Sequence, residues 1–283
     1  MKWRRAIATT VPVMGAGAAA LALSSYRHAM ARAESAWQDV ASRAEPSGGN
    51  FDPAMVVKLP EIAQRYFRRA IAPGTALKTC VKLEMQGRFL LGDKWSYRTY
   101  AMRARQILRP PFEFVWIPKM TSRFLSISGS DALVAGSAWT HFWLLGLVPV
   151  VNAGTSPDLV RSATFRTAME GLWVPASLLP QNGAEWDQLG PDMARIRLRH
   201  VFPEIVLEMT LAANGSVREV SGQRWSNANR ERVFRLQPFG GSLSSDATFG
   251  GYTIPNVLQM GNHFGTDEFL PFFQVGVSRV AYL

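Results

Sequence analysis

Residues 81–91 read VKLEMQGRFLL, and this stretch decides the fold class. From Val81 to Leu91 every second residue is apolar or glycine, and the residues between them from Lys82 to Arg88 are polar. Successive side chains of a β-strand point to opposite faces of the sheet. The alternation therefore predicts a half-buried strand of an antiparallel sheet, with one face against a core and one in water.

The same period of two recurs on the C-terminal side of this stretch. Strands are predicted at residues 94–108, 112–117, 124–128 and 132–138, with a Ser-Gly-Ser-Asp turn at residues 128–131. From Met193 a second series begins, in which arginines at 195, 197 and 199 could pair with glutamates at 204 and 208 across a hairpin. Further strands are predicted at residues 217–225, 231–236, 252–254, 257–264 and 274–283. About eleven strands and a few helices indicate an α+β fold that is mainly β, in a single domain over residues 55–283.

Two segments have the spacing of helices. Apolar residues between Met55 and Ile71 recur every three or four positions, which predicts an amphipathic helix that covers the sheet. Thr155-Ser-Pro-Asp158 places a capping residue ahead of a proline, so a helix is predicted to begin there and to run to about Met169.

Large apolar residues gather between His141 and Leu179, where the regular alternation stops. They predict an apolar insertion that either fills the concave face of the sheet as core or lines a cavity or a membrane-facing rim, because so many exposed side chains would each forfeit about 1.5–3 kcal/mol. The candidate ligand-binding residues are Trp116, Trp139, Phe142, Trp143, Leu147, Trp173 and Leu178.

Polar residues near this insertion support a structural role and an alternative catalytic one. Arg166 and Glu170 stand four apart on the predicted helix, so they are predicted to form a structural ion pair. The alternative combines Glu170 with Arg224 or His263 as an acid–base site. His200 is predicted to lie on the inner face of its strand as a hydrogen-bonded core residue.

The motifs of common catalytic and metal sites are missing from the sequence. It contains no Gly-x-Ser-x-Gly elbow, no P-loop and no His-Glu-x-x-His helix, and Cys80 is its only cysteine. We therefore predict no catalytic residue, no metal site, no cofactor and no disulfide.

The amino terminus has the layout of a targeting segment. Lys2, Arg4 and Arg5 precede the apolar residues 6–23, so residues 1–33 are predicted to be a signal anchor or a signal peptide, and residues 34–54 a helical tether. Eighteen helical residues span ~27 Å, close to the thickness of a bilayer core. Basic residues ahead of the apolar run predict a protein of the bacterial inner membrane with its body on the periplasmic side. The alternatives are secretion after cleavage near Ala20 or Ala22, and a buried alanine-rich helix of a cytosolic protein.

The net charge is +10, from 31 basic and 21 acidic residues, and five of the basic residues lie within residues 1–33. The remaining basic residues are scattered, and no recognition helix accompanies them. Nucleic acid is therefore not expected as a partner.

Several phrases of the sequence resemble an uncharacterised bacterial family over about residues 55–283. They are Leu59–Phe67, Gly87–Phe89, Phe112–Trp116, Asp131 with Gly136, Met169–Pro180, and Gly215 with Arg224. This resemblance implies domain limits but no reaction.

A more distant resemblance links residues 80–140 to the periplasmic lipoprotein carriers. It rests on the Gly-x-Phe strand, on residues 109–116 and on residues 127–133. It implies one large curved antiparallel sheet, an incomplete β-barrel with covering helices. The N-terminal hydrophobic helix predicted from residues 6–23 and the apolar insertion depart from the carrier pattern. The resemblance also implies a cavity for a lipid or other apolar ligand, so we expect a membrane-tethered envelope protein that binds one. The alternatives are a structural or interaction module of the envelope with a fully packed core, and the enzyme described above.

Overall fold

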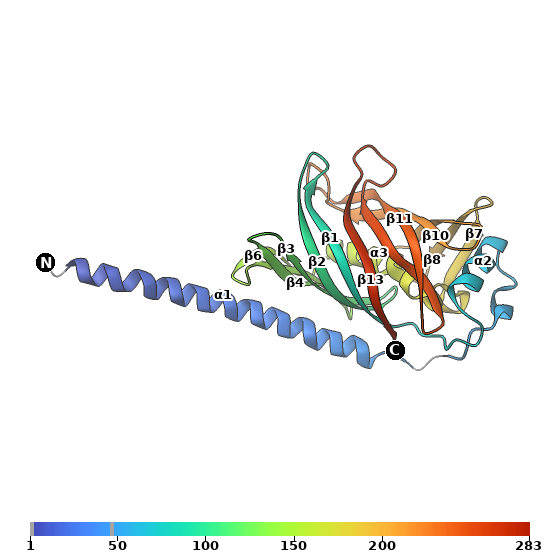
Figure 1. Ribbon diagram of the computed structural model, residues 1–283, viewed down its shortest axis with the longest axis horizontal. Helices are drawn as coiled ribbons and strands as arrows, with labels where there is room; N and C mark the ends of the chain where they lie inside the picture. The colour runs from blue at the N-terminus through green and yellow to red at the C-terminus, as the bar shows by residue number, and fades with distance from the viewer. Residues whose placement is uncertain (1–2, 46–47) are drawn as a thin grey trace.

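The computed structural model describes residues 3–45 and 48–283, with side chains from residue 20 onward. One curved antiparallel sheet of thirteen strands runs in the order β6-β5-β4-β3-β2-β1-β13-β12-β11-β10-β9-β8-β7 and is not closed into a barrel (Figure 1). This confirms the predicted fold class. Every strand pairs with its sequence neighbour, except that β6 and β7 form the two edges and β1 pairs with β13.

The strands are β1 (Val81–Asp93), β2 (Ser96–Arg109), β3 (Glu113–Thr121), β4 (Ser126–Val134), β5 (Ser137–Leu144), β6 (Val148–Ala153), β7 (Ala184–Gln188), β8 (Met193–Leu198), β9 (Ile205–Leu211), β10 (Val217–Ser226), β11 (Arg235–Phe249), β12 (Tyr252–Asn262) and β13 (Leu270–Tyr282). The helices are α1 (Trp3–Ser42), α2 (Glu61–Ala70) and α3 (Pro157–Met169), with 3-10 turns η1 (Pro53–Val56), η2 (Glu170–Trp173), η3 (Pro175–Leu178) and η4 (Pro180–Asn182).

The strand β1 follows the alternation from which it was predicted. Val81, Leu83 and Met85 are buried in the main core, whereas Glu84 and Gln86 are exposed. The predicted hairpin is also present: β8 pairs with β9, Arg195 lies opposite Glu208, and the two side chains form an ion pair of 2.7 Å.

The concave face of the sheet is covered by α3 and by η2 and η3 (Figure 1). The helix α3 begins as predicted, because the Ser156 hydroxyl accepts a hydrogen bond from the Leu159 amide and Pro157 occupies the first turn. The helix α2 buries Ile62, Tyr66 and Phe67 against the end of the sheet that carries β7 and β8. These elements share one apolar core.

The outer face of the sheet is covered by the C-terminal part of α1. Ala33, Ala36, Trp37 and Val40 pack there on a second, smaller core that includes Ile107 and Trp139. The segment predicted as a tether, residues 34–54, therefore contacts the domain through Ala36, Trp37 and Val40, and the last residue of the predicted leader, Ala33, joins this contact. Its end is held by Arg43, which donates two hydrogen bonds to Glu113.

Two parts of the central sheet differ from the sequence prediction. The predicted turn at residues 128–131 is wrong, because β4 runs straight through it and the turn lies at Ala135-Gly136. Gly129 serves close packing instead: a Cβ atom there would lie 1.9 Å from the His141 carbonyl oxygen. The first part of the insertion predicted between His141 and Leu179 is also wrong, because residues 141–153 form the end of β5, a tight turn and β6.

The predicted membrane-spanning helix at residues 6–23 lies mostly in a part of α1 whose side chains are not described. Among the described residues, none of the helices combines the length and the apolar character required to cross a membrane. Residues 6–19, most of the predicted span 6–23, lie outside the residues whose side chains are described.

Candidate ligand cavity

A cavity of about 340 Å³ lies between the concave face of the sheet and the segment formed by α3 and η2. Ligand sites are typically about 300–1,000 Å³, so this volume is sufficient for one small ligand. The lining residues are Phe89, Leu91, Trp116, Met120, Ile127, Asp131, Thr140, Phe142, Val150, Val151, Arg166, Met169, Glu170, Leu172, Trp173, Val220, Arg224, Phe239, Leu243, Leu258, Met260, Phe272 and Phe273.

Aromatic rings form one wall of the cavity. Trp116 lies 6.1–6.2 Å, centroid to centroid, from the rings of Phe89, Phe142 and Phe273. Trp173 is fixed by its indole N–H, which donates to the Pro255 carbonyl oxygen at 3.0 Å. These contacts fix the rings in place, so that they line the cavity with apolar surface and leave its volume free.

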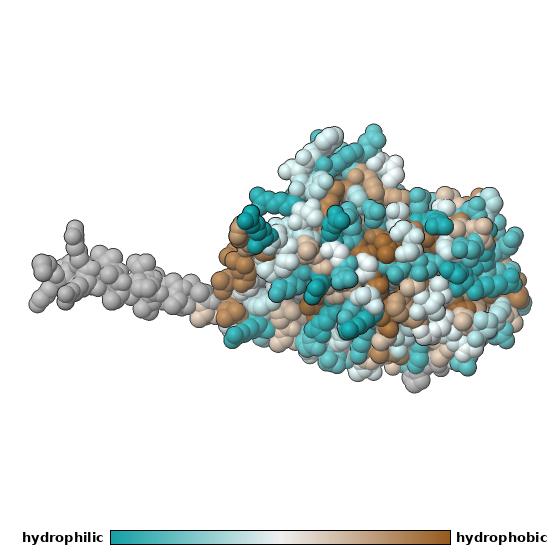
Figure 2. Space-filling model, in the orientation of Figure 1, coloured by the Kyte–Doolittle hydropathy of each residue, from teal (hydrophilic) through white to brown (hydrophobic). Residues whose placement is uncertain are grey.

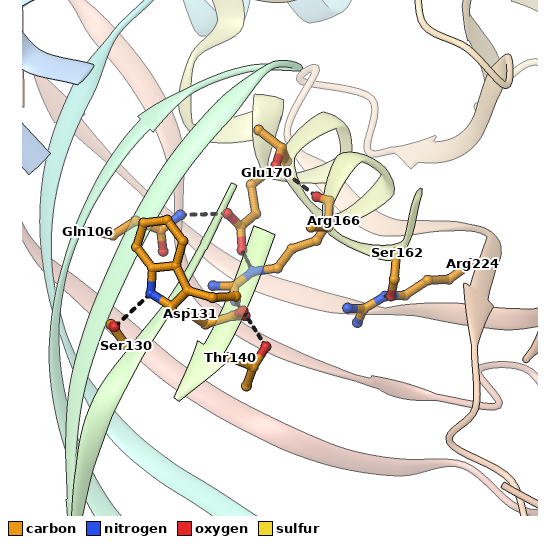
Figure 3. Close-up of polar contacts among 11 residues, drawn as sticks. Gln106, Ser130, Asp131, Thr140, Ser162, Arg166, Glu170 and Arg224 are labelled. Atoms are coloured by element: carbon orange, nitrogen blue, oxygen red, sulfur yellow. Dashed lines mark hydrogen bonds and ion pairs between the residues drawn. The ribbon is translucent and has the colours of Figure 1, made fainter. Parts of the chain in front are cut away.

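A charged cluster centred on Arg166 forms the polar part of the lining (Figure 3). The Arg166 guanidinium donates to Glu170 at 2.7 Å, which is the predicted i,i+4 pair, and also to Asp131 from β4. The same carboxylates accept hydrogen bonds from Gln106 and Thr140. Burial lowers the pKa of Arg166, but Glu170 and Asp131 more than offset this, so its pKa lies above the ordinary value.

Arg224 from β10 is the second cation in the lining, and its bonding differs. Its Nε donates to the Ser162 hydroxyl at 3.1 Å, and its guanidinium carbon lies 4.9 Å from the centroid of Phe239. Burial, followed by repulsion from Arg166, lowers the pKa of Arg224 to about 10. It therefore stays charged at neutral pH.

Three of the seven predicted ligand-binding residues line the cavity, namely Trp116, Phe142 and Trp173. Trp139 and Trp143 lie on the opposite face of β5, against Arg32 and Tyr26 of α1. Alternation along a strand explains this, because Thr140 and Phe142 point inward and their neighbours point outward. The other two do not line the cavity either: Leu147 is exposed in the β5–β6 turn, and Leu178 is buried in the main core.

The histidines of the sequence do not enter this site. His263 does not line the cavity, and its Nε2 lies 2.9 Å from the Ala228 carbonyl oxygen. The prediction that His200 faces the core is wrong: it follows the end of β8, where it is exposed beside the Gly183 carbonyl oxygen. Of the proposed acid–base set, the lining contains only Glu170 and Arg224.

Within the described residues, His, Cys, Asp and Glu form no group of three that could hold a metal ion. Cys80 is buried under α1, and burial raises the pKa of its thiol to about 11, so it is not poised as a nucleophile.

A second hollow of about 710 Å³ lies over β8–β11 beside α3. It is larger, but charged and polar residues such as Arg161, Glu208 and Gln223 take a large part in its lining. An apolar ligand is better matched by the cavity around Trp116.

Phe272 and Phe273 are lining residues that the sequence prediction missed. The last strand was predicted from residue 274, whereas β13 begins at Leu270 and brings both rings to the cavity. Phe89 could have been found, because it continues the inward alternation of residues 81–91.

The model of a family of unknown function, DUF6544, matches residues 49–275. The chain belongs to this family. The match confirms the resemblance noted over about residues 55–283. No curated protein matches the chain.

Two solved structures resemble the DUF6544 protein, each at 10% sequence identity. A LolA superfamily protein from Nitrosomonas europaea aligns with 78% of this chain and 92% of its own, with a TM-score of 0.38. A domain from Vibrio parahaemolyticus, whose name assigns it to outer membrane lipoprotein sorting, aligns with 78% of this chain and 91% of its own, with a TM-score of 0.33.

Proposed function

We propose that this protein binds a lipid or another elongated apolar ligand in the cavity around Trp116, next to a membrane surface. The observation that carries the proposal is the cavity itself. A fully packed interlayer, as a purely structural module would have, leaves few voids larger than a water molecule. Here about 340 Å³ stays open, lined mainly by apolar and aromatic side chains with a few polar groups among them.

The rim of the cavity supports access from an apolar phase. Val150 and Val151 of the edge strand β6 line the cavity and are also exposed at the surface. Leu145 and Leu147 in the adjoining turn and Val148 at the start of β6 are exposed as well. Figure 2 shows an apolar patch at this end of the domain, where α1 leaves it. Contiguous exposed apolar surface of this kind marks interaction or membrane sites.

The amino-terminal segment supports the choice of a membrane as the neighbour. Leu21 of α1 is 75% exposed, and Tyr26 one turn later packs against Trp143 and Gly146 at the base of the same hairpin. The apolar residues 6–23 thus precede the point at which α1 reaches the patch. We propose that they tether the protein to the bacterial inner membrane with its domain on the periplasmic side.

Two substitutions on β6 test ligand binding in the cavity. Val151→Trp places a large ring at the lined rim, and Val148→Trp places the same ring on the same strand outside the lining. With a fluorescent long-chain ligand, Val151→Trp is expected to weaken binding about tenfold, or about 1.4 kcal/mol, and Val148→Trp to leave it unchanged. Equal effects of the two variants, or no binding by the wild type, would refute the proposal.

A topology reporter tests the location separately. A reporter that works only outside the cytoplasm, fused after residue 50, should be active when the fusion is expressed. An expressed but silent fusion would contradict the periplasmic placement and leave the cavity proposal standing.

A further inference from the structure

Arg224 is a partly buried cation in the cavity lining, and it has more hydrogen-bond donors than the surrounding residues have acceptors for them. A guanidinium carries five N–H groups and accepts no hydrogen bond. Only its Nε–H has an acceptor among the described residues, the Ser162 hydroxyl. Among the described residues, its terminal amino groups have no hydrogen-bond acceptor and no carboxylate oxygen within 4.0 Å, and the residue is part of the cavity lining.

The neighbouring carboxylates are already engaged. Asp131 accepts from Arg166 and Thr140, and Glu170 accepts from Arg166 and Gln106. Figure 3 shows these bonds on one side and the guanidinium of Arg224 apart from them. The two arginines and the two carboxylates in the lining have a net charge of zero, so the positive charge of Arg224 offsets the second carboxylate without contacting it. This offset of charge gives the terminal N–H groups of Arg224 no hydrogen-bond acceptor.

Donors of a charged group beside an apolar cavity are the natural partners of a ligand group of opposite charge, because a hydrogen-bonded ion pair is stronger where water is scarce. The planar fork of an arginine fits the two oxygens of a carboxylate or phosphate, with which it forms short, strong hydrogen bonds. The remaining lining within reach is apolar and aromatic, which suits a hydrocarbon chain. Recognition of a charged head and of a chain are thus combined in one cavity.

We propose that the ligand is an amphiphile with one anionic head group, a carboxylate or a phosphate, which binds the terminal amino groups of Arg224. The chain of this amphiphile lies along the wall formed by Phe89, Trp116 and Phe273. This inference rests on the proposed function, because it names the ligand class of the same cavity. In it Arg166 is structural and Arg224 is the residue that selects the head group.

A matched pair of probes tests the selection on the full-length protein. A fluorescent long-chain carboxylic acid and its methyl ester share dye and chain and differ only in the charge of the head. The wild type should bind the acid at least tenfold more tightly than the ester. In Arg224→Gln the ratio should fall to about one, mainly through weaker binding of the acid. The control Arg218→Gln removes an exposed charge from the same strand and should keep the wild-type ratio.

The outcomes separate the two proposals. If acid and ester bind equally to the wild type, or if Arg224→Gln keeps the preference, the head-group proposal is overturned and the cavity proposal survives. If neither probe binds, both fail. The wild-type ratio needs no variant, so the test holds even if Arg224→Gln does not fold.

Two further measurements identify the form of the ligand. Acetate and inorganic phosphate, added at the probe concentration, should not displace the acid, because the chain provides part of the affinity; displacement by either would indicate a site for free anions and overturn the proposal. A carboxyl-labelled fatty acid, titrated by carbon NMR, should stay ionised in the wild type at pH values at which it is protonated in Arg224→Gln. Identical titrations would also overturn it.

Discussion

Replacement of Arg166 by methionine tests whether the charged cluster holds α3 on the concave face. The side chain is 14% exposed and bonds to Glu170 and Asp131, whose side chains are 14% and 19% exposed. Its guanidinium carbon also lies 4.4 Å from the ring centroid of Phe114. Methionine keeps much of the volume but leaves both carboxylates without their main partner.

The expected cost follows from the burial of these charges. Removing one partner from a buried ion pair typically costs about 3–5 kcal/mol, because the other charge stays buried. In a domain of about 150–250 residues, 1 kcal/mol lowers Tm by about 2–4 °C. The Arg166→Met variant should therefore melt about 6–20 °C below the wild type.

The matched control is Arg195→Met, which breaks the ion pair with Glu208 on the outer surface. The two side chains are 33% and 38% exposed. Exposed pairs contribute about 0–1 kcal/mol, so this variant should lose no more than about 4 °C. Circular dichroism melts and urea titrations of both variants give the comparison. Arg166→Met losing no more stability than Arg195→Met would refute the structural role of the cluster.

Two other predictions concern α1 and the apolar patch. Hydrogen bonds from Arg43, Ala135 and Arg109 outweigh burial and lower the pKa of Glu113, so its stabilising contribution is present above its unfolded pKa and is lost as the pH falls through the lower folded value. Glu113→Gln should thus be less stable than wild type by about 1–3 kcal/mol at pH 7 in urea titrations, and this difference should shrink below pH 4.5; a constant difference would contradict it. A polarity-sensitive dye on Leu147→Cys should shift to the blue when anionic vesicles are added, whereas on Phe202→Cys, exposed outside the patch, it should not; the same shift at both sites would argue against membrane contact by the patch.

The parts of the fold predicted correctly are those in which one face of an element meets water. In β1 the polar residues Glu84 and Gln86 mark the exposed face, so its period of two is visible in the sequence. In α3, Ser156 and Pro157 specify the first turn locally. Such signals depend only on neighbouring residues, and they need no knowledge of what packs from far away.

The strand β5 was not recognised because both of its faces are covered. Phe142 points to the cavity, while Trp139 and Trp143 pack under α1, so large apolar residues occur on both faces of the strand and no simple alternation is visible. Which of these rings line the cavity depends on the packing of a helix more than a hundred residues away. For the same reason the partners of Arg224 could not be foreseen, since they come from elements that meet only in the folded chain.

The strand β5 connects the proposed tether with the proposed cavity, because α1 packs on one of its faces and the cavity lies against the other. Tyr26 of α1 lies against Trp143 at 5.5 Å between ring centroids, and its hydroxyl is 3.0 Å from that of Ser128 on β4. The neighbouring residue Phe142 forms part of the cavity wall. Because one strand carries both contacts, the direction of α1 fixes the position of the β5–β6 rim. If residues 6–23 enter a bilayer, the exposed side of the rim is then held beside its surface, next to a cavity that Val150 and Val151 line.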